Sequence, residues 1–93
     1  MRQLIKTDGT VIELEDPLTI RQITKMLNAE FMDNVNLPDH IHVMILDDDG
    51  YIKDLPVNEK ATEIYHTKCI PGTTHAIRGD VVIAPDQDFA KNK

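Results

Sequence analysis

The sequence has little of several residue types, and each shortage excludes a class of protein. It contains no tryptophan, a single cysteine (Cys69) and four scattered glycines. One cysteine cannot form an internal disulfide, and separated glycines provide no glycine-rich loop for binding phosphates. The longest apolar runs have four residues, whereas a membrane-spanning helix needs about 20. We therefore expect no disulfide framework, no phosphate loop and no membrane span.

The charge balance is acidic. Ten basic and sixteen acidic side chains give the 93 residues a formal net charge of −6. Binding to phosphate backbones depends on concentrated Lys and Arg, so we expect no direct binding to duplex nucleic acid. The sequence does not open with a basic segment followed by an apolar stretch, which indicates a chain without a secretion signal and a cytoplasmic location. Its length is typical of one small domain, predicted over residues 1–85 and followed by a frayed polar tail at 86–93.

The first half of the chain predicts a hairpin followed by a long helix. Residues 4–6 and 11–14 flank Asp8-Gly9, a pair typical of tight hairpin turns, and we expect one side of this hairpin to be buried. Thr19 is placed as a helix N-cap, and Gln22 completes a capping box. The helix is predicted to run from about Ile20 to about Met32, with turn residues at 33–39 ending it.

The second half predicts shorter elements. Residues 40–46 have apolar side chains on both faces, which indicates an interior strand, and residues 51–53 are predicted to form a short strand. Asn58 is a plausible cap for a helix from 59 to about 68, and residues 81–84 form the last strand. This order of elements predicts an α+β fold: a single small domain with a β-grasp-like (ubiquitin-like) mixed sheet, one long helix and one short helix.

One region has the residue types of a site for a small anion. The N-terminus of the helix after Asn58 has exposed amides that attract negative charge, and Arg78 adds a planar set of donors. The candidate ligand-binding residues are Asn58, Lys60, Thr62, Tyr65, His75, Arg78 and Asp80. A nucleotide is the type of ligand that they would bind. The alternative is that Asn58 only caps a helix, Tyr65 packs in the core and Asp80 fixes a turn.

Metal binding and catalysis have weaker signals. His40 and His42 are expected on one face of a strand, His66 and Cys69 are three residues apart, and His75 follows them. These are zinc-ligand types, but no Cys-x-x-Cys or His-Glu-x-x-His spacing joins them. No nucleophile motif is present either. We therefore assign no catalytic residue, no metal and no cofactor, and keep a zinc-binding or hydrolytic protein as a further alternative.

Three other motifs have simple structural explanations. In residues 47–50 an EF-hand would place Ile45 and Pro56 where carboxylates are needed, so this segment is interpreted as a solvated acidic turn. Lys53 and Lys60 dilute the acidic residues too much for a mimic of DNA. The tripeptide at 78–80 is more simply a turn than an adhesion motif.

A longer motif carries a family resemblance. Asp49-Gly50, then Leu55-Pro56-x-Asn58-x-x-Ala61-Thr62-x-x-Tyr65, then Gly79-Asp80-Val81-Val82 resemble a domain-of-unknown-function family of short proteins from phages, plasmids and accessory bacterial regions. The resemblance covers about residues 4–84, and its specific part is 49–82. The segment 69–75 is longer than in that family, which affects the position of the last strand.

The resemblance implies a setting rather than an activity. It implies a small accessory protein of a phage or mobile element that acts in the host cytoplasm by binding a host or phage protein, as a counter-defence inhibitor does. The alternative is a sponge for a signalling nucleotide. Because an interior strand implies free sheet edges, self-association into a homo-oligomer is also expected.

Overall fold

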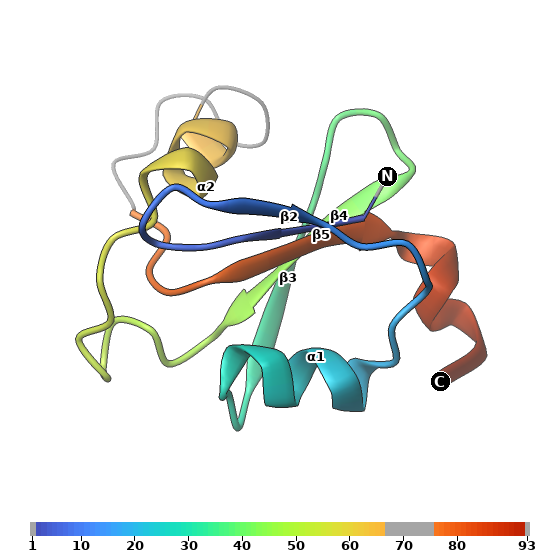
Figure 1. The fold of residues 1–93 in the computed structure, drawn as a ribbon, viewed down its shortest axis with the longest axis horizontal. Coiled ribbons are helices and arrows are strands. Elements are labelled where there is room, and N and C mark those ends of the chain that lie inside the picture. The colour runs from blue at the N-terminus through green and yellow to red at the C-terminus, as the bar shows by residue number, and fades with distance from the viewer. Residues whose placement is uncertain (1, 67–75, 93) are drawn as a thin grey trace.

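The structure is a computed structural model, and it describes residues 2–66 and 76–92. Five strands form one sheet in the order β2-β1-β5-β4-β3 (Figure 1). In chain order the elements are β1 (Gln3–Ile5), β2 (Val11–Glu13), α1 (Ile20–Leu27), β3 (Met32–Asn36), β4 (His42–Asp47), α2 (Glu59–Ile64), β5 (Val81–Pro85) and the 3₁₀ helix η2 (Asp86–Asn92). All four strand pairs are antiparallel. The predicted α+β class is confirmed, whereas the expected mixed pairing of the sheet is wrong.

Each face of the sheet carries its own apolar layer, and the central strand β5 contributes to both. Val82 and Ala84 pack with side chains of α1 and η2. Val81 and Ile83 pack on the opposite face with side chains of α2. Figure 1 shows α2 above the sheet and α1 below it. Burial on both faces explains why the sequence of β5 is a continuous apolar run.

The N-terminal hairpin forms as predicted, but β2 is not buried. β1 and β2 pair antiparallel, and Gly9 alone supplies the positive φ of the turn, at 93°. Asp8 instead accepts a hydrogen bond from the amide of Thr10 at 2.8 Å. The side chains of β2 are all exposed because this strand is an edge of the sheet, with β1 on its other side. The prediction that one side of the hairpin is buried therefore holds for β1 and is wrong for β2.

Helix α1 begins where the sequence predicts and ends earlier. Thr19 caps it, and both hydrogen bonds of the capping box with Gln22 are present. The helix ends at Leu27, because Asn28 adopts the left-handed conformation with φ of 53°. The predicted extension to Met32 is wrong, because Met32 opens β3. Of the turn predicted at 33–39, residues 33–36 belong to β3 instead, and a turn follows at 38–39. Pairing of every residue of β3 with β4 outweighs the low strand propensity of the polar residues in β3.

The segment around β4 also differs in part from expectation. β4 lies between β5 and β3, which confirms an interior strand. It begins at His42, because His40 lies in a turn with φ of 61°. The strand predicted at residues 51–53 is a turn, in which the amides of Lys53 and Asp54 donate to the carbonyl oxygens of Asp49 and Tyr51. Local hydrogen bonds therefore replace the expected strand pairing there.

The two C-terminal helices complete the fold. Asn58 caps α2 as predicted, and the expected helix end near residue 68 lies outside the described residues. The tail expected to be frayed forms η2 instead, with Phe89 buried against the sheet and Asp88 paired with Arg2 at 2.7 Å. In the described ranges, no helix combines the length and hydropathy that crossing a bilayer requires.

Candidate functional site

The first predicted site residue, Asn58, is committed to the fold. Its side chain is fully buried. The side-chain oxygen accepts a hydrogen bond from the amide of Ala61 at 3.1 Å, which caps α2. The side-chain nitrogen donates to the carbonyl oxygens of Ile5 and Gly79, both at 3.0 Å. These three bonds occupy its polar atoms, so Asn58 presents no group to a ligand.

Two more predicted residues have similar structural roles. The hydroxyl of Thr62 accepts a hydrogen bond from the amide of Ile77 at 2.9 Å, which fixes the approach to β5 beside α2. Asp80 accepts a hydrogen bond from the amide of Thr7 at 3.0 Å and so links that approach to the N-terminal hairpin. The structural alternative for this region included a role for Asp80 in a turn, whereas the role of Thr62 was not predicted.

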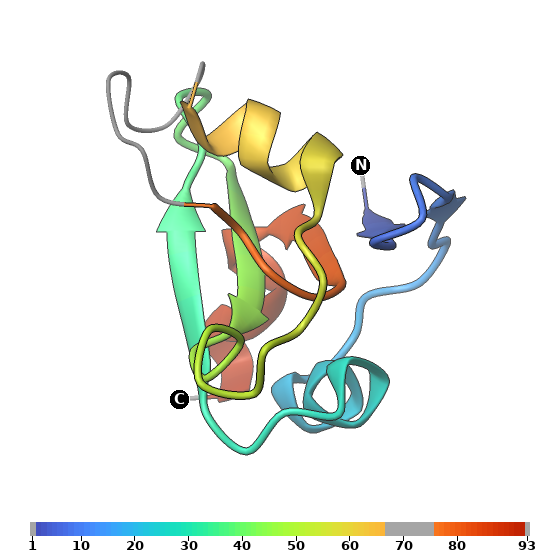
Figure 2. The same ribbon diagram turned by 90° about the vertical axis from the view of Figure 1, so that its left-hand side faces the viewer.

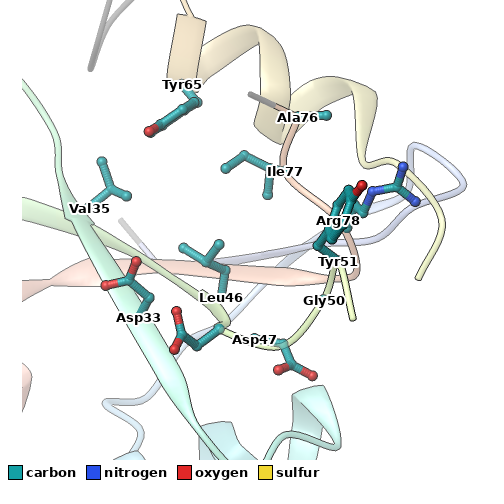
Figure 3. A pocket seen from close by; sticks show the side chains of 11 residues that line it. Asp33, Val35, Leu46, Asp47, Gly50, Tyr51, Tyr65, Ala76, Ile77 and Arg78 are labelled. Carbon is teal, nitrogen blue, oxygen red and sulfur yellow. The ribbon is translucent and has the colours of Figure 1, made fainter. Parts of the chain in front are cut away.

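The remaining predicted residues divide into three cases. Lys60 is exposed on α2. His75 lies outside the described residues. Tyr65 and Arg78 line one cavity of about 360 Å³, so the structure brings these two together (Figure 3). The whole lining is Asp33, Val35, Leu46, Asp47, Asp48, Gly50, Tyr51, Tyr65, Ala76, Ile77 and Arg78.

The cavity has an acidic side that sequence reasoning did not identify. Asp33 of β3, Asp47 at the end of β4 and Asp48 directly after it all line the cavity. Figure 3 shows Asp33 and Asp47 on the opposite side of Leu46 from Tyr65. Asp47 is buried and bonds to the ammonium group of Lys53 at 2.8 Å. This bond is the main cause that raises the pKa of Lys53. The sequence does not predict this acidic lining, because residues 33–36 are not predicted to form a strand beside β4.

Arg78 is held at the other side of the cavity. Its guanidinium donates to the carbonyl oxygen of Leu55 at 3.0 Å, contacts the carboxylate of Asp54 at 3.4 Å and lies 5.4 Å from the ring centre of Tyr51. Figure 3 shows the guanidinium directed away from Asp33. These contacts orient Arg78 toward the 51–55 turn and away from the interior of the cavity. The cavity therefore suits a neutral or cationic group better than an anion.

Tyr51, which lines this cavity, is one of three large and exposed side chains carried by the segments around it. Phe31 is 63% exposed, Tyr51 81% and Ile52 82%. The segments that carry them are joined, because the amide of Asp48 donates to the carbonyl oxygen of Phe31 at 3.0 Å and the Lys53 ammonium reaches the carbonyl oxygen of Asn28 at 3.3 Å. We call Phe31, Tyr51 and Ile52 the apolar turn surface. The sequence feature that could have indicated this surface is the pair Tyr51-Ile52, two large side chains in a segment that forms a turn and not a strand.

The candidate metal ligands do not converge in the described part of the chain. No group of three or more His, Cys, Asp or Glu side chains there could hold a metal ion. His42 bonds through Nδ1 to Asp39, and its Nε2 is buried without a hydrogen-bond partner among the described atoms. Because His40 precedes the strand, the two histidines do not share a strand face. Cys69 and His75 lie outside the described residues.

Comparison of the chain with models of protein families, with curated proteins and with solved structures finds no significant match. The resemblance carried by residues 49–82 therefore stays a prediction.

Proposed function

We propose that this chain is a small non-catalytic module that acts by binding a protein. The supporting observation is the apolar turn surface, on which three large side chains are mostly exposed to solvent. Isolated exposed apolar residues are ordinary, but a group of them beside a cavity is typical of an interaction site. Tyrosine is enriched among the residues that dominate binding energy at protein interfaces.

The charge around this surface indicates the chemistry of the partner. Asp33 and Asp48 line the cavity beside the apolar turn surface, whereas the charge of Asp47 is paired with Lys53. A complementary partner would present an apolar patch with Lys or Arg at its border, because opposite charges favour encounter and register. In the setting that the family resemblance implies, this partner is a host protein and the chain is a phage or mobile-element accessory protein, such as a counter-defence inhibitor. We also propose that the fold is related to that of β-grasp domains.

Binding of a small anion, such as a signalling nucleotide, has less support. Three of its seven predicted residues hold the fold together, and Arg78 is bound to a carbonyl oxygen and a carboxylate. A zinc-binding or hydrolytic role would depend on Cys69 and His75. The apolar turn surface therefore favours a protein partner over both alternatives.

The test compares three forms of the tagged chain in bacterial lysates. The wild type, the double variant Tyr51→Ser/Ile52→Ser and the control variant Ile41→Ser are used as baits in parallel. Ile41 is a matched control because it is 57% exposed and precedes β4, whereas Tyr51 and Ile52 follow the other end of that strand. Thermal unfolding of each form checks that its fold is unchanged.

We expect one protein to be enriched by the wild type and by Ile41→Ser, and to be lost with the double variant. That protein, once purified, should bind the double variant at least 10-fold more weakly, as expected for loss of a buried tyrosine and an aliphatic contact. Equal capture by all three forms, or no enriched protein in any lysate, would rule out the apolar turn surface as a binding site.

A further inference from the structure

The sheet has two edge strands, and one of them is blocked. Directly before and after β3, the carbonyl of Phe31 and the amide of Leu37 both bond toward the β4 side. Alternation along an antiparallel ladder then turns the backbone groups of Met32, Asn34 and Asn36 outward. The carboxylate of Asp33 accepts a hydrogen bond from the amide of Asn34 at 2.8 Å, so the central outward donor is occupied. A charged side chain on the edge is one way in which proteins prevent pairing with another chain.

The other edge, β2, is open. The carbonyl of Thr10 and the amide of Leu14 bond to β1, both at 2.8 Å. The same alternation therefore places Ile12 toward β1 and turns the amides and carbonyls of Val11 and Glu13 outward. None of the backbone hydrogen bonds found between described elements uses these outward groups. Figure 2 shows β2 and β3 at the two opposite edges of the sheet.

β2 carries one exposed apolar side chain on each face of the sheet, next to a buried residue of β1. Ile12 pairs with Leu4, which belongs to the layer under α1, and is 40% exposed. Val11 pairs with Ile5, which belongs to the layer under α2, and is 37% exposed. A further strand added at this edge would cover one β-branched side chain on each face. Such side chains are those that contribute most through cross-strand contacts.

We propose that β2 pairs antiparallel with β2 of a second copy of this chain, about a two-fold axis at Ile12. In this register Val11 lies opposite Glu13 of the second copy, and both residues turn their backbone groups outward. The pairing forms four hydrogen bonds, two at each Val11–Glu13 pair. The two Ile12 side chains meet at the position where antiparallel strands approach most closely.

A second copy fits this edge because the strand is complementary to itself. The two outward residues flank Ile12 symmetrically, so each outward donor meets an outward acceptor. The only charged residue of β2, Glu13, faces Val11 and not another glutamate. The interface is small, so we expect a weak equilibrium with a dissociation constant on the order of 0.1 mM. Each copy carries a net charge of −6, so added salt should strengthen the dimer by screening repulsion.

Sedimentation equilibrium of the full chain between about 10 µM and 1 mM tests the proposal. The variant Val11→Pro removes an outward amide from each copy and leaves the bonds between β2 and β1 in place. The variant Asn34→Pro is the matched control, because it removes an outward amide from β3 without changing the charge. The variant Ile12→Lys places two ammonium groups together at the two-fold axis. Circular dichroism melting checks the fold of each variant.

We expect the wild type and Asn34→Pro to dimerise alike, and Val11→Pro and Ile12→Lys to associate at least 10-fold more weakly. A wild type that stays monomeric up to 1 mM would overturn the proposal and leave β2 open to a strand of another protein. Loss of the dimer only in Asn34→Pro would move the interface to β3. The double variant Tyr51→Ser/Ile52→Ser should dimerise normally, so this result is independent of the proposed protein-binding surface.

Discussion

The side-chain amide of Asn58 donates a hydrogen bond to the carbonyl oxygen of Ile5, 53 residues away in the chain, at 3.0 Å. The same nitrogen also donates to the carbonyl oxygen of Gly79. One buried side chain thus joins the start of α2 to β1 and to the segment that enters β5. The motif around Asn58, which drew attention as a ligand site, is explained by this junction.

Replacing Asn58 should destabilise the protein severely. In Asn58→Ala the amide of Ala61 loses its capping acceptor and two carbonyl oxygens each lose one buried hydrogen bond, which should cost roughly 3 kcal/mol of unfolding free energy. Asn58→Asp keeps the capping oxygen but sets a carboxylate against both carbonyls, so it should also destabilise strongly. Urea unfolding measures both, with Asn36→Ala as an exposed control that should change stability by less than about 0.5 kcal/mol. An Asn58→Ala cost as small as that of the control would contradict the assigned role.

The capping box of α1 gives a second prediction. Thr19→Ala removes the hydroxyl that accepts the amide of Gln22 at 3.1 Å, and should cost about 1 kcal/mol. Thr24→Ala is the same substitution inside the helix, where the hydroxyl donates back to the carbonyl oxygen of Ile20 at 2.7 Å. Such a bond does not stabilise a helix and alanine has the higher helix propensity, so this change should be close to neutral. Chemical denaturation of both variants checks the difference. Equal effects at the two positions would show that the cap does not stabilise α1.

Two glycines with positive φ provide a matched comparison. Gly79 has φ of 86°, and a Cβ atom there would lie 2.9 Å from Cδ1 of Leu55. Gly9 has φ of 93°, and a Cβ atom there would meet no atom within 4 Å. Gly9→Ala should therefore cost only the backbone strain, about 1 kcal/mol, and Gly79→Ala should cost somewhat more, because Cδ1 of Leu55 must also shift. Thermal unfolding of the two variants measures this, and a larger loss at Gly9 would contradict it.

Features that depend on near neighbours could be predicted from the sequence. The capping box needs only Thr19 and Gln22, three residues apart, and the hairpin turn needs only a glycine that tolerates positive φ. The apolar run of β5 was also sufficient to predict a strand, because a short continuous apolar run is typical of a strand that is buried on both faces. These predictions were confirmed because the sequence contains the whole of each interaction.

Features that depend on distant partners could not be predicted from the sequence. The polar residues of β3 do not resemble a strand, and only their pairing with β4 makes them one. The acidic side of the cavity could not be predicted for the same reason, because only the pairing of β3 with β4 brings Asp33 to the cavity that Asp47 and Asp48 line. Thr62 and Asp80 were interpreted as possible ligand contacts because their partners, Ile77 and Thr7, are 15 and 73 residues away. Sequence spacing contains no information about such contacts.

The turn before β4 gives a prediction about pH. The amides of His42 and Ile41 donate to the carboxylate of Asp39 at 2.9 Å and 2.8 Å, and the His42 ring bonds to it as well. These bonds favour the ionised carboxylate and lower the pKa of Asp39 from 3.8 to about 2, with the backbone amide of His42 the largest cause. The unfolded chain therefore binds a proton at this residue more readily than the folded chain does.

The sign of the effect follows from this difference. The stabilisation by Asp39 should be complete above its ordinary pKa of 3.8 and should be lost as the pH falls toward 2. An NMR titration of the Asp39 carboxyl carbon should give a midpoint near 2. Asp39→Asn keeps one acceptor oxygen but cannot titrate, so the stability difference between wild type and variant should shrink across this pH range. A midpoint at or above 3.8, or a difference that stays constant down to pH 2, would show that these hydrogen bonds do not hold the carboxylate in its ionised form.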